Sequence, residues 1–372
     1  MVIRNEINAG RIPGPRLRAA SPEVTSTGGF GDFRRMHQPD IQTFEWIADG
    51  PIELRRTVRM LAREGVETIK MNLSGENAGR AGMSERLGFT DEETAAAADQ
   101  AREWGLDLAC HAQAAASVKM AVRHGFRMIY HCGWADDEAL DLLESKKHEL
   151  FVAPAVGLVY ATAHDADKYD VPKQVRRERG AQAMLERYIE VYAKIRKRGI
   201  RVLPGGDYGF AWNPIGNNAR DLEHFVKLFG YTTHEVLRAA TMFGGDLMHL
   251  GGELGQVKAG YLADLLLVDG DPTEDVAILQ DKASGRYVDV AKPAVCLRRC
   301  SPTGAEPGSG FAPARHHLSG LDNGQEVGRL ETGPPDQRTI DVGLGQEFTS
   351  VIGLDTAAVL NPRRLRDLWI VV

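Results

Sequence analysis

Two histidines end equivalent stretches of this sequence. His111 closes the apolar run LDLACH and His131 closes the run FRMIYH, with one helix-length segment between them. Lys70 in TIKMNL and Asp207 in VLPGGD stand at or near the ends of two further apolar runs. Neutral imidazole is the commonest metal ligand in proteins, and carboxylate oxygen completes many sites for divalent cations. The residue types therefore fit a metal site, provided that the fold brings these four positions together.

Each residue taken alone has a simpler interpretation. A lone histidine after an apolar run is more often a hydrogen-bonded residue of the core or its rim than a ligand. Lys70 could reach solvent from a strand end or form a salt bridge, and its ammonium cannot ligate a cation because it only donates hydrogen bonds. Asp207 follows two glycines and could be a turn residue. Their common placement at run ends favours a joint function.

The surrounding sequence alternates helix-like and strand-like segments. Gly65, Gly105 and Gly199 follow helical patterns at the points where helices should stop. The expected helices cover residues 51–64, 91–104, 116–124, 137–147 and 174–198, and the expected strands cover residues 66–73, 106–111, 126–131, 150–154 and 200–207. Each connection is long enough for a parallel crossover, so the pattern predicts an α/β fold with a parallel sheet.

The placement of the polar residues favours a closed barrel over an open sheet. An open sheet would spread four strand ends over about 20 Å, because neighbouring strands lie about 4.8 Å apart. In a (β/α)8 TIM-like barrel, the carboxyl ends of the strands converge on one mouth, where catalytic residues cluster. The sequence therefore predicts a barrel of this kind, with the candidate residues at its mouth.

Composition and charge limit the classes of partner that this protein could bind. Of the 372 residues, 43% are hydrophobic and 26% charged, and the formal net charge of -6 argues against nucleic acid or an anionic membrane as a partner. The sequence has neither an apolar run of membrane-spanning length nor a secretory h-region. Its cysteines show no disulfide spacing and suit a reducing compartment: Cys110, Cys132, Cys296 and Cys300. We expect a cytoplasmic protein that acts on a small molecule and could form a homo-oligomer.

Several motifs together resemble the amidohydrolase superfamily, in its imidazolonepropionase- and prolidase-like branch. The motifs are RIPGPRLRAAS, TIKMNLSGE, CHAQAAASVKMAVRHGFRMIYHCG, LPGGDYG and EVLRAATMFGGDLMHLGGELGQVKAGYLADLLLVDGDP. The resemblance covers about residues 2–281, and its last motif is the most specific part. It implies a barrel with one or two divalent metal ions, Zn by preference, at its mouth.

The same resemblance assigns roles to individual residues. Lys70 would be N-carboxylated, which converts a cation into a carbamate ligand that can bridge two metals. His111 and His131 would ligate the second of the two metals, and Asp207 would bind the first metal and act as the catalytic proton shuttle. Tyr160 and His164, expected in a loop after the seventh barrel strand, could contact substrate. The implied function is a hydrolase that cleaves C–N bonds of amide, cyclic amide or dipeptide-like substrates through metal-activated water.

The sequence also departs from the family pattern. Relatives carry His-x-His on their first strand, and no such motif occurs here. If RLRAAS is the third strand, the chain holds six of eight barrel strands and is N-terminally incomplete. We expect an incomplete barrel over residues 1–250, C-terminal strands of a small β-sandwich over 251–283 and an irregular or disordered tail over 284–372. The alternative to the enzyme is therefore a truncated or degraded relative without activity.

Overall fold

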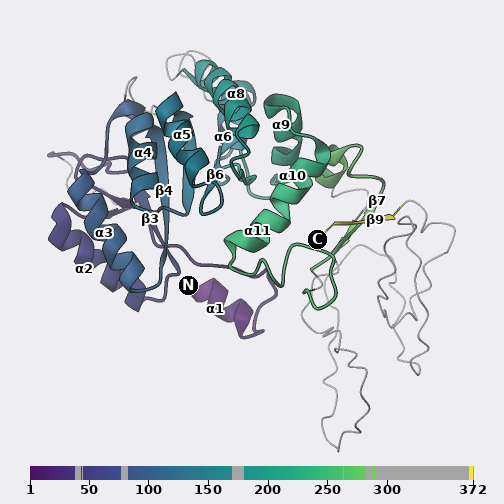
Figure 1. The fold of residues 1–372 in the computed structure, drawn as a ribbon, viewed down its shortest axis with the longest axis horizontal. Coiled ribbons are helices and arrows are strands. Elements are labelled where there is room, and N and C mark those ends of the chain that lie inside the picture. The colour runs from purple at the N-terminus through teal and green to yellow at the C-terminus, as the bar shows by residue number, and fades with distance from the viewer. Residues whose placement is uncertain are drawn as a thin grey trace, which may run out of the picture.

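The computed structural model describes residues 1–37, 43, 45–76, 83–169, 180–262, 264–281, 287–289 and 368–371. Short strands and helices alternate along most of this length (Figure 1). No helix of the described residues is long and apolar enough to cross a membrane.

Six parallel strands form the main sheet, in the order β2-β1-β3-β4-β5-β6. They are β1 (Val24–Thr25), β2 (Trp46–Ile47), β3 (Thr68–Asn72), β4 (Asp107–Ala114), β5 (Met128–Trp134) and β6 (Phe151–Ala153). A single parallel bridge from Val152 to Val202 extends the sheet beyond β6. Among the described residues nothing pairs the Val202 edge with β2, so the sheet stays open. The predicted parallel α/β fold of an incomplete barrel is confirmed.

Helices connect the strands and end where the sequence indicates. They are α1 (Val2–Asn8), α2 (Gly50–Arg63), α3 (Asp91–Glu103), α4 (Ala115–Arg123), α5 (Asp137–Ser145), α6 (Val156–His164), α8 (Ala181–Lys197), α9 (Arg220–Phe229), α10 (Thr233–Ala240) and α11 (Met242–Leu247), with short 3₁₀ turns η1 (Met83–Glu85), η2 (Ala166–Tyr169) and η3 (Val276–Gln280). A capping box starts α3: the Thr90 side chain accepts from the N–H of Glu93, and the Glu93 side chain accepts from the N–H of Thr90. Gly65 follows α2 with a left-handed φ of 84°, which glycine adopts without steric cost.

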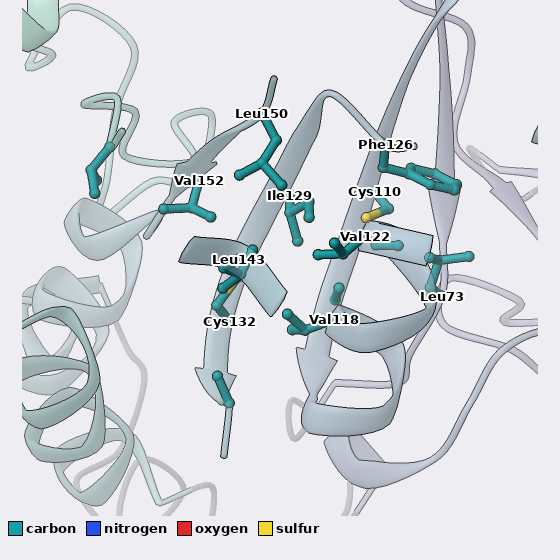
Figure 2. Close-up of a cluster of buried hydrophobic side chains, with 14 of the residues drawn as sticks. Leu73, Cys110, Val118, Val122, Phe126, Ile129, Cys132, Leu143, Leu150 and Val152 are labelled. Atoms are coloured by element: carbon teal, nitrogen blue, oxygen red, sulfur yellow. The ribbon is translucent and has the colours of Figure 1, made fainter. Parts of the chain in front are cut away.

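The core lies between the sheet and its helices. Side chains of β4 and β5 interlock there with α4 and α5, as Figure 2 shows for Cys110, Ile129, Val118 and Leu143. Cys110 and Cys132 are fully buried, free thiols in this cluster. Since side chains alternate along a strand, each cysteine faces the helices while the neighbouring histidine faces the other side of the sheet. Both cysteines are therefore residues of the core.

Two predicted strands are much shorter than expected. The segment 16–21 contributes only a bridge from Ala20 to Thr68, and β1 begins after Pro22. The segment 200–207 contributes only the bridge at Val202, which Pro204 and two glycines follow. Proline lacks the N–H that a ladder needs, and glycine weakens strands, so both segments lose their pairing early.

A second, antiparallel sheet lies in the C-terminal part. Its central strand β7 (Leu266–Asp269) pairs with β8 (Tyr287–Asp289) on one side and β9 (Leu368–Val371) on the other. β7 falls within residues 251–283, where C-terminal strands were expected. Apart from β8 and β9, the predicted irregular tail over 284–372 lies outside the described residues, and the division into domains stays a prediction.

Candidate metal centre

The four predicted site residues line one cavity. It has a volume of about 1070 Å³, and its lining includes Lys70, His111, His131 and Asp207. The two histidines come from neighbouring strands, where His131 lies opposite Ala112. Their ring centroids are 4.4 Å apart with an interplanar angle of 61°. The four residues therefore line the same cavity, and the rings of the two histidines are in contact there.

Each imidazole is neutral and anchored through one nitrogen. Nε2 of His111 lies 3.0 Å from the carbonyl oxygen of Gly75, and a ring N–H of His131 donates to the carbonyl of Pro154. Burial, followed by the nearby Lys70 charge, lowers the pKa of His111 to about 4. Burial also lowers the pKa of His131 well below its usual value, with His111 and Lys70 contributing. A backbone carbonyl thus holds one ring nitrogen of each histidine and leaves a lone pair on the other, as in many metal-ligating histidines.

Lys70 forms a salt bridge, one of the alternatives that the sequence left open, with a partner that the sequence did not indicate. Its Nζ lies 3.0 Å from Oε1 of Glu23 and 5.0 Å from the ring centroid of Tyr130, while Asn72 donates to Oε2 of Glu23 at 2.9 Å. Burial would raise the pKa of Glu23, but Lys70 and Asn72 outweigh it and lower that pKa. Lys70 is therefore held as a cation in this structure. The acid was missed because it lies 47 residues from its partner, although an acidic residue beside a predicted strand was the available signal.

Asp207 occupies a strained backbone position at the cavity. Its φ is 54°, in the left-handed region that residues other than glycine rarely adopt. His131, Cys132 and Ala155 share this conformation, with φ values of 74°, 54° and 57°. Such positions cluster at functional sites, where surrounding contacts hold them. The side chain of Asp207 is open to the cavity, yet the surrounding protein raises its pKa and Glu23 adds to this, while Lys70 opposes it.

The donor set matches a divalent cation in type but is incomplete in arrangement. Two neutral imidazoles and a carboxylate are the ligands that Zn²⁺ accepts. Within the part of the chain that the structure describes, however, no group of three or more His, Cys, Asp or Glu side chains is arranged to hold an ion. Lys70 can add a ligand only after its amine has been converted into an anion. The residues fit a metal if Lys70 is modified and Asp207 turns toward the histidines.

The two predicted substrate contacts lie elsewhere. Tyr160 and His164 belong to helix α6 rather than to a loop, because VGLVYATAH is an apolar run without turn residues apart from one glycine. The ring of Tyr160 packs on His164 at 4.5 Å and on His224 at 4.4 Å, and the guanidinium of Arg220 lies over it. Neither residue is among those that line the cavity. Their contact with substrate stays a prediction.

Other side chains lie closer to the histidines. The ring of Phe30, from the GGFGDF loop after β1, stacks on His111 with centroids 4.7 Å apart. Gln113 lies two residues beyond His111 on β4 and donates to Glu76 at 2.8 Å and to the Tyr188 hydroxyl at 3.0 Å. All of them line the cavity. The period of two along a strand could have indicated Gln113, since it faces the same side as His111.

A buried carboxyl beside this site should make stability depend on pH. Asp221 is 1% exposed, and burial raises its pKa to about 7 although the Tyr208 hydroxyl and the Gly205 N–H oppose this. The native carboxyl therefore keeps its proton up to neutral pH, whereas the unfolded chain loses it near pH 4. The unfolded state binds fewer protons in that window, so the free energy of unfolding should fall from pH 4 to 7 and then level off.

Asp221→Asn should remove this fall. The difference in unfolding free energy, variant minus wild type, should rise by roughly 2–4 kcal/mol between pH 4 and pH 8. Urea denaturation at several pH values measures it. Asp137→Asn is the control, because that side chain is 81% exposed and should leave the profile unchanged. Parallel profiles for wild type and Asp221→Asn would show that the buried carboxyl is not protonated at neutral pH.

A parallel α/β sheet with polar side chains at the carboxyl ends of its strands is the architecture of (β/α)8 enzymes. Residues 3–291 match the family model described as the amidohydrolase family, and the chain belongs to that family. This confirms the resemblance seen in the sequence.

Two curated proteins and one solved structure are similar to this chain. It is 25% identical to ochratoxinase from Aspergillus niger over 304 residues, which cover 77% of this chain and 61% of the relative. It is 25% identical to imidazolonepropionase from Sphingopyxis alaskensis over 194 residues, which cover 51% of this chain and 42% of the relative. The crystal structure of a Xaa-Pro dipeptidase with bound methionine matches with a TM-score of 0.65 and 27% identity, covering 75% of this chain and 68% of that one. The chain thus spans less than two thirds of the curated relatives.

Proposed function

We propose that this chain carries the metal-binding part of a hydrolase that cleaves C–N bonds of small amide-type substrates. One observation carries the proposal. The ring centroids of two neutral imidazoles, His111 and His131, lie 4.4 Å apart in a cavity that Asp207 also lines. A core role alone would not require both rings to be anchored on carbonyls while facing a shared cavity. Family membership supports the same class of reaction.

His111, His131, Asp207 and a carboxylated Lys70 would hold one or two ions, for which Zn²⁺ is our candidate. A divalent ion at such a site polarises the scissile carbonyl and lowers the pKa of water. Asp207 would accept a proton from the attacking water and return it to the leaving nitrogen, which requires an approach of about 3 Å. The raised pKa of Asp207 makes its carboxylate a stronger proton acceptor.

The substrate proposal stays at the level of a class. Relatives named as an ochratoxinase and a Xaa-Pro dipeptidase suggest two probes, ochratoxin and Xaa-Pro dipeptides. A cavity of about 1070 Å³ has room for either size of molecule. The cytoplasmic location and homo-oligomer formation stay predictions.

The carboxylation of Lys70 can be tested without substrate. Incubation of the full chain with ¹³C-bicarbonate and Zn²⁺ should give one carbamate carbon signal in the NMR spectrum, since the ion stabilises the anionic ligand. Lys70→Gln should lack this signal. Lys119→Gln should keep it, because Lys119 lies on α4 and pairs with Asp136 and Glu138. An unchanged spectrum in Lys70→Gln would contradict a carbamate at this residue.

A second candidate is a relative without hydrolytic activity. The Lys70–Glu23 salt bridge favours it, because a lysine held as a cation repels a metal ion. Elemental analysis after equilibration with Zn²⁺ separates the candidates. At least one ion per chain, together with hydrolysis of a probe, supports the hydrolase, whereas a chain that retains no ion supports the inactive relative.

A further inference from the structure

Asn213 holds the backbone that carries Asp207. It is 4% exposed, and its Nδ2 donates to the carbonyl oxygens of Gly206 at 2.7 Å and of Asp207 at 3.0 Å. These are the two carbonyls on either side of the Asp207 N–H and Cα. One side chain therefore spans the residue whose φ lies in the left-handed region.

The backbone of Asn213 closes the same loop. Its N–H donates to the carbonyl of Phe210 at 2.9 Å, and its carbonyl accepts from the N–H of Gly209 at 3.0 Å. Asn213 is thereby held in a tight antiparallel bridge with Phe210. These bonds fix the backbone from which the side-chain amide reaches residues 206 and 207.

The first turn of α6 holds this loop from the other side. The N–H of Leu158 donates to the carbonyl of Gly206 at 2.8 Å. A Cβ on Gly157 would lie 3.0 Å from Cα of Gly206, so the two backbones approach as closely as glycine allows. The preceding Pro154 accepts from the ring of His131. The start of α6 therefore contacts the supports of both His131 and Asp207.

We propose that Asn213 is a positioning residue for Asp207. A left-handed aspartate persists only where its surroundings hold it, and the two Nδ2 bonds are the side-chain contacts that do so here. Without them the backbone at residue 207 can relax toward common φ values, and the direction from which the carboxylate enters the cavity is no longer fixed. The proposal rests on the proposed function, in which Asp207 is a ligand.

A double-mutant cycle on metal affinity tests this in the full chain. Calorimetric titration with Zn²⁺ should show about 10-fold weaker binding for Asn213→Ala, the lower end of what such supporting contacts contribute. Asp207→Ala should weaken binding by more. In the Asp207→Ala background, Asn213→Ala should cause no further loss, because the residue that it positions is gone. Asn217→Ala, an exposed change in the same loop, should leave affinity unchanged.

The outcomes separate the two proposals. Normal affinity in Asn213→Ala, or an equal loss with and without Asp207, overturns the positioning role and leaves the metal site intact. Normal affinity in Asp207→Ala removes Asp207 from the metal site and overturns both. If circular dichroism shows that Asn213→Ala does not fold, Asn213→Ser takes its place in the cycle, since its hydroxyl keeps one donor.

Discussion

Alanine in place of either His111 or His131 should abolish tight binding of Zn²⁺. His111 and His131 are the two imidazoles in the described lining of the cavity, so the loss of either should exceed the roughly 10–100-fold effect typical of residues that only support a ligand. Calorimetric titration and elemental analysis of the purified variants measure the affinity and the number of ions. Circular dichroism confirms that the fold survives the loss of a buried ring.

His124→Ala is the matched control for both variants. His124 follows α4 at the surface and bonds to Asp91 at 3.0 Å, away from the cavity lining. The His124→Ala variant should bind Zn²⁺ with the affinity of the wild type. If His111→Ala or His131→Ala also retained one ion per chain at wild-type affinity, that imidazole would be a structural residue and not a ligand.

Asp207→Asn should reduce hydrolysis of an amide probe by roughly 10²–10⁴-fold, the usual contribution of a general acid–base group. Asparagine has the same shape and tolerates the left-handed conformation, so the backbone at φ 54° should persist. The amide cannot accept and return the proton. Steady-state kinetics with a Xaa-Pro dipeptide and with ochratoxin measure the loss.

Asp99→Asn provides the comparison for this effect. Its side chain is 53% exposed on α3, where it pairs with Arg102. The Asp99→Asn variant should hydrolyse the amide probe at the wild-type rate. A wild-type rate in Asp207→Asn would mean that another group transfers the proton, and Glu23 beside Lys70 would be the first to examine.

Local patterns predicted the parts of the fold that depend on local physics. Helical periodicity located α2, α3 and α5, because each helix buries one apolar face, and terminal glycines marked the ends of α2 and α3. Apolar runs located β3, β4 and β5, and with them His111 and His131. The cavity followed from the rule that parallel strands end at one edge of the sheet.

These local patterns could not predict contacts between residues that lie far apart in the sequence. The Lys70–Glu23 salt bridge joins β3 to the residue before β1, and no spacing in the sequence encodes that pair. Tyr160 and His164 were expected in a loop but lie in helix α6, where the ring of Tyr160 packs on His224. The support of Asp207 by Asn213 depends on a left-handed residue that only coordinates reveal.

The central claim is that His111 and His131 bind the same ion. X-ray absorption at the zinc edge of the loaded full chain tests it most directly, because the number of imidazole ligands per ion can be counted. Two imidazole nitrogens at about 2.0–2.1 Å are predicted, falling to one in His111→Ala. A spectrum with fewer than two imidazoles per ion in the wild type would contradict the claim.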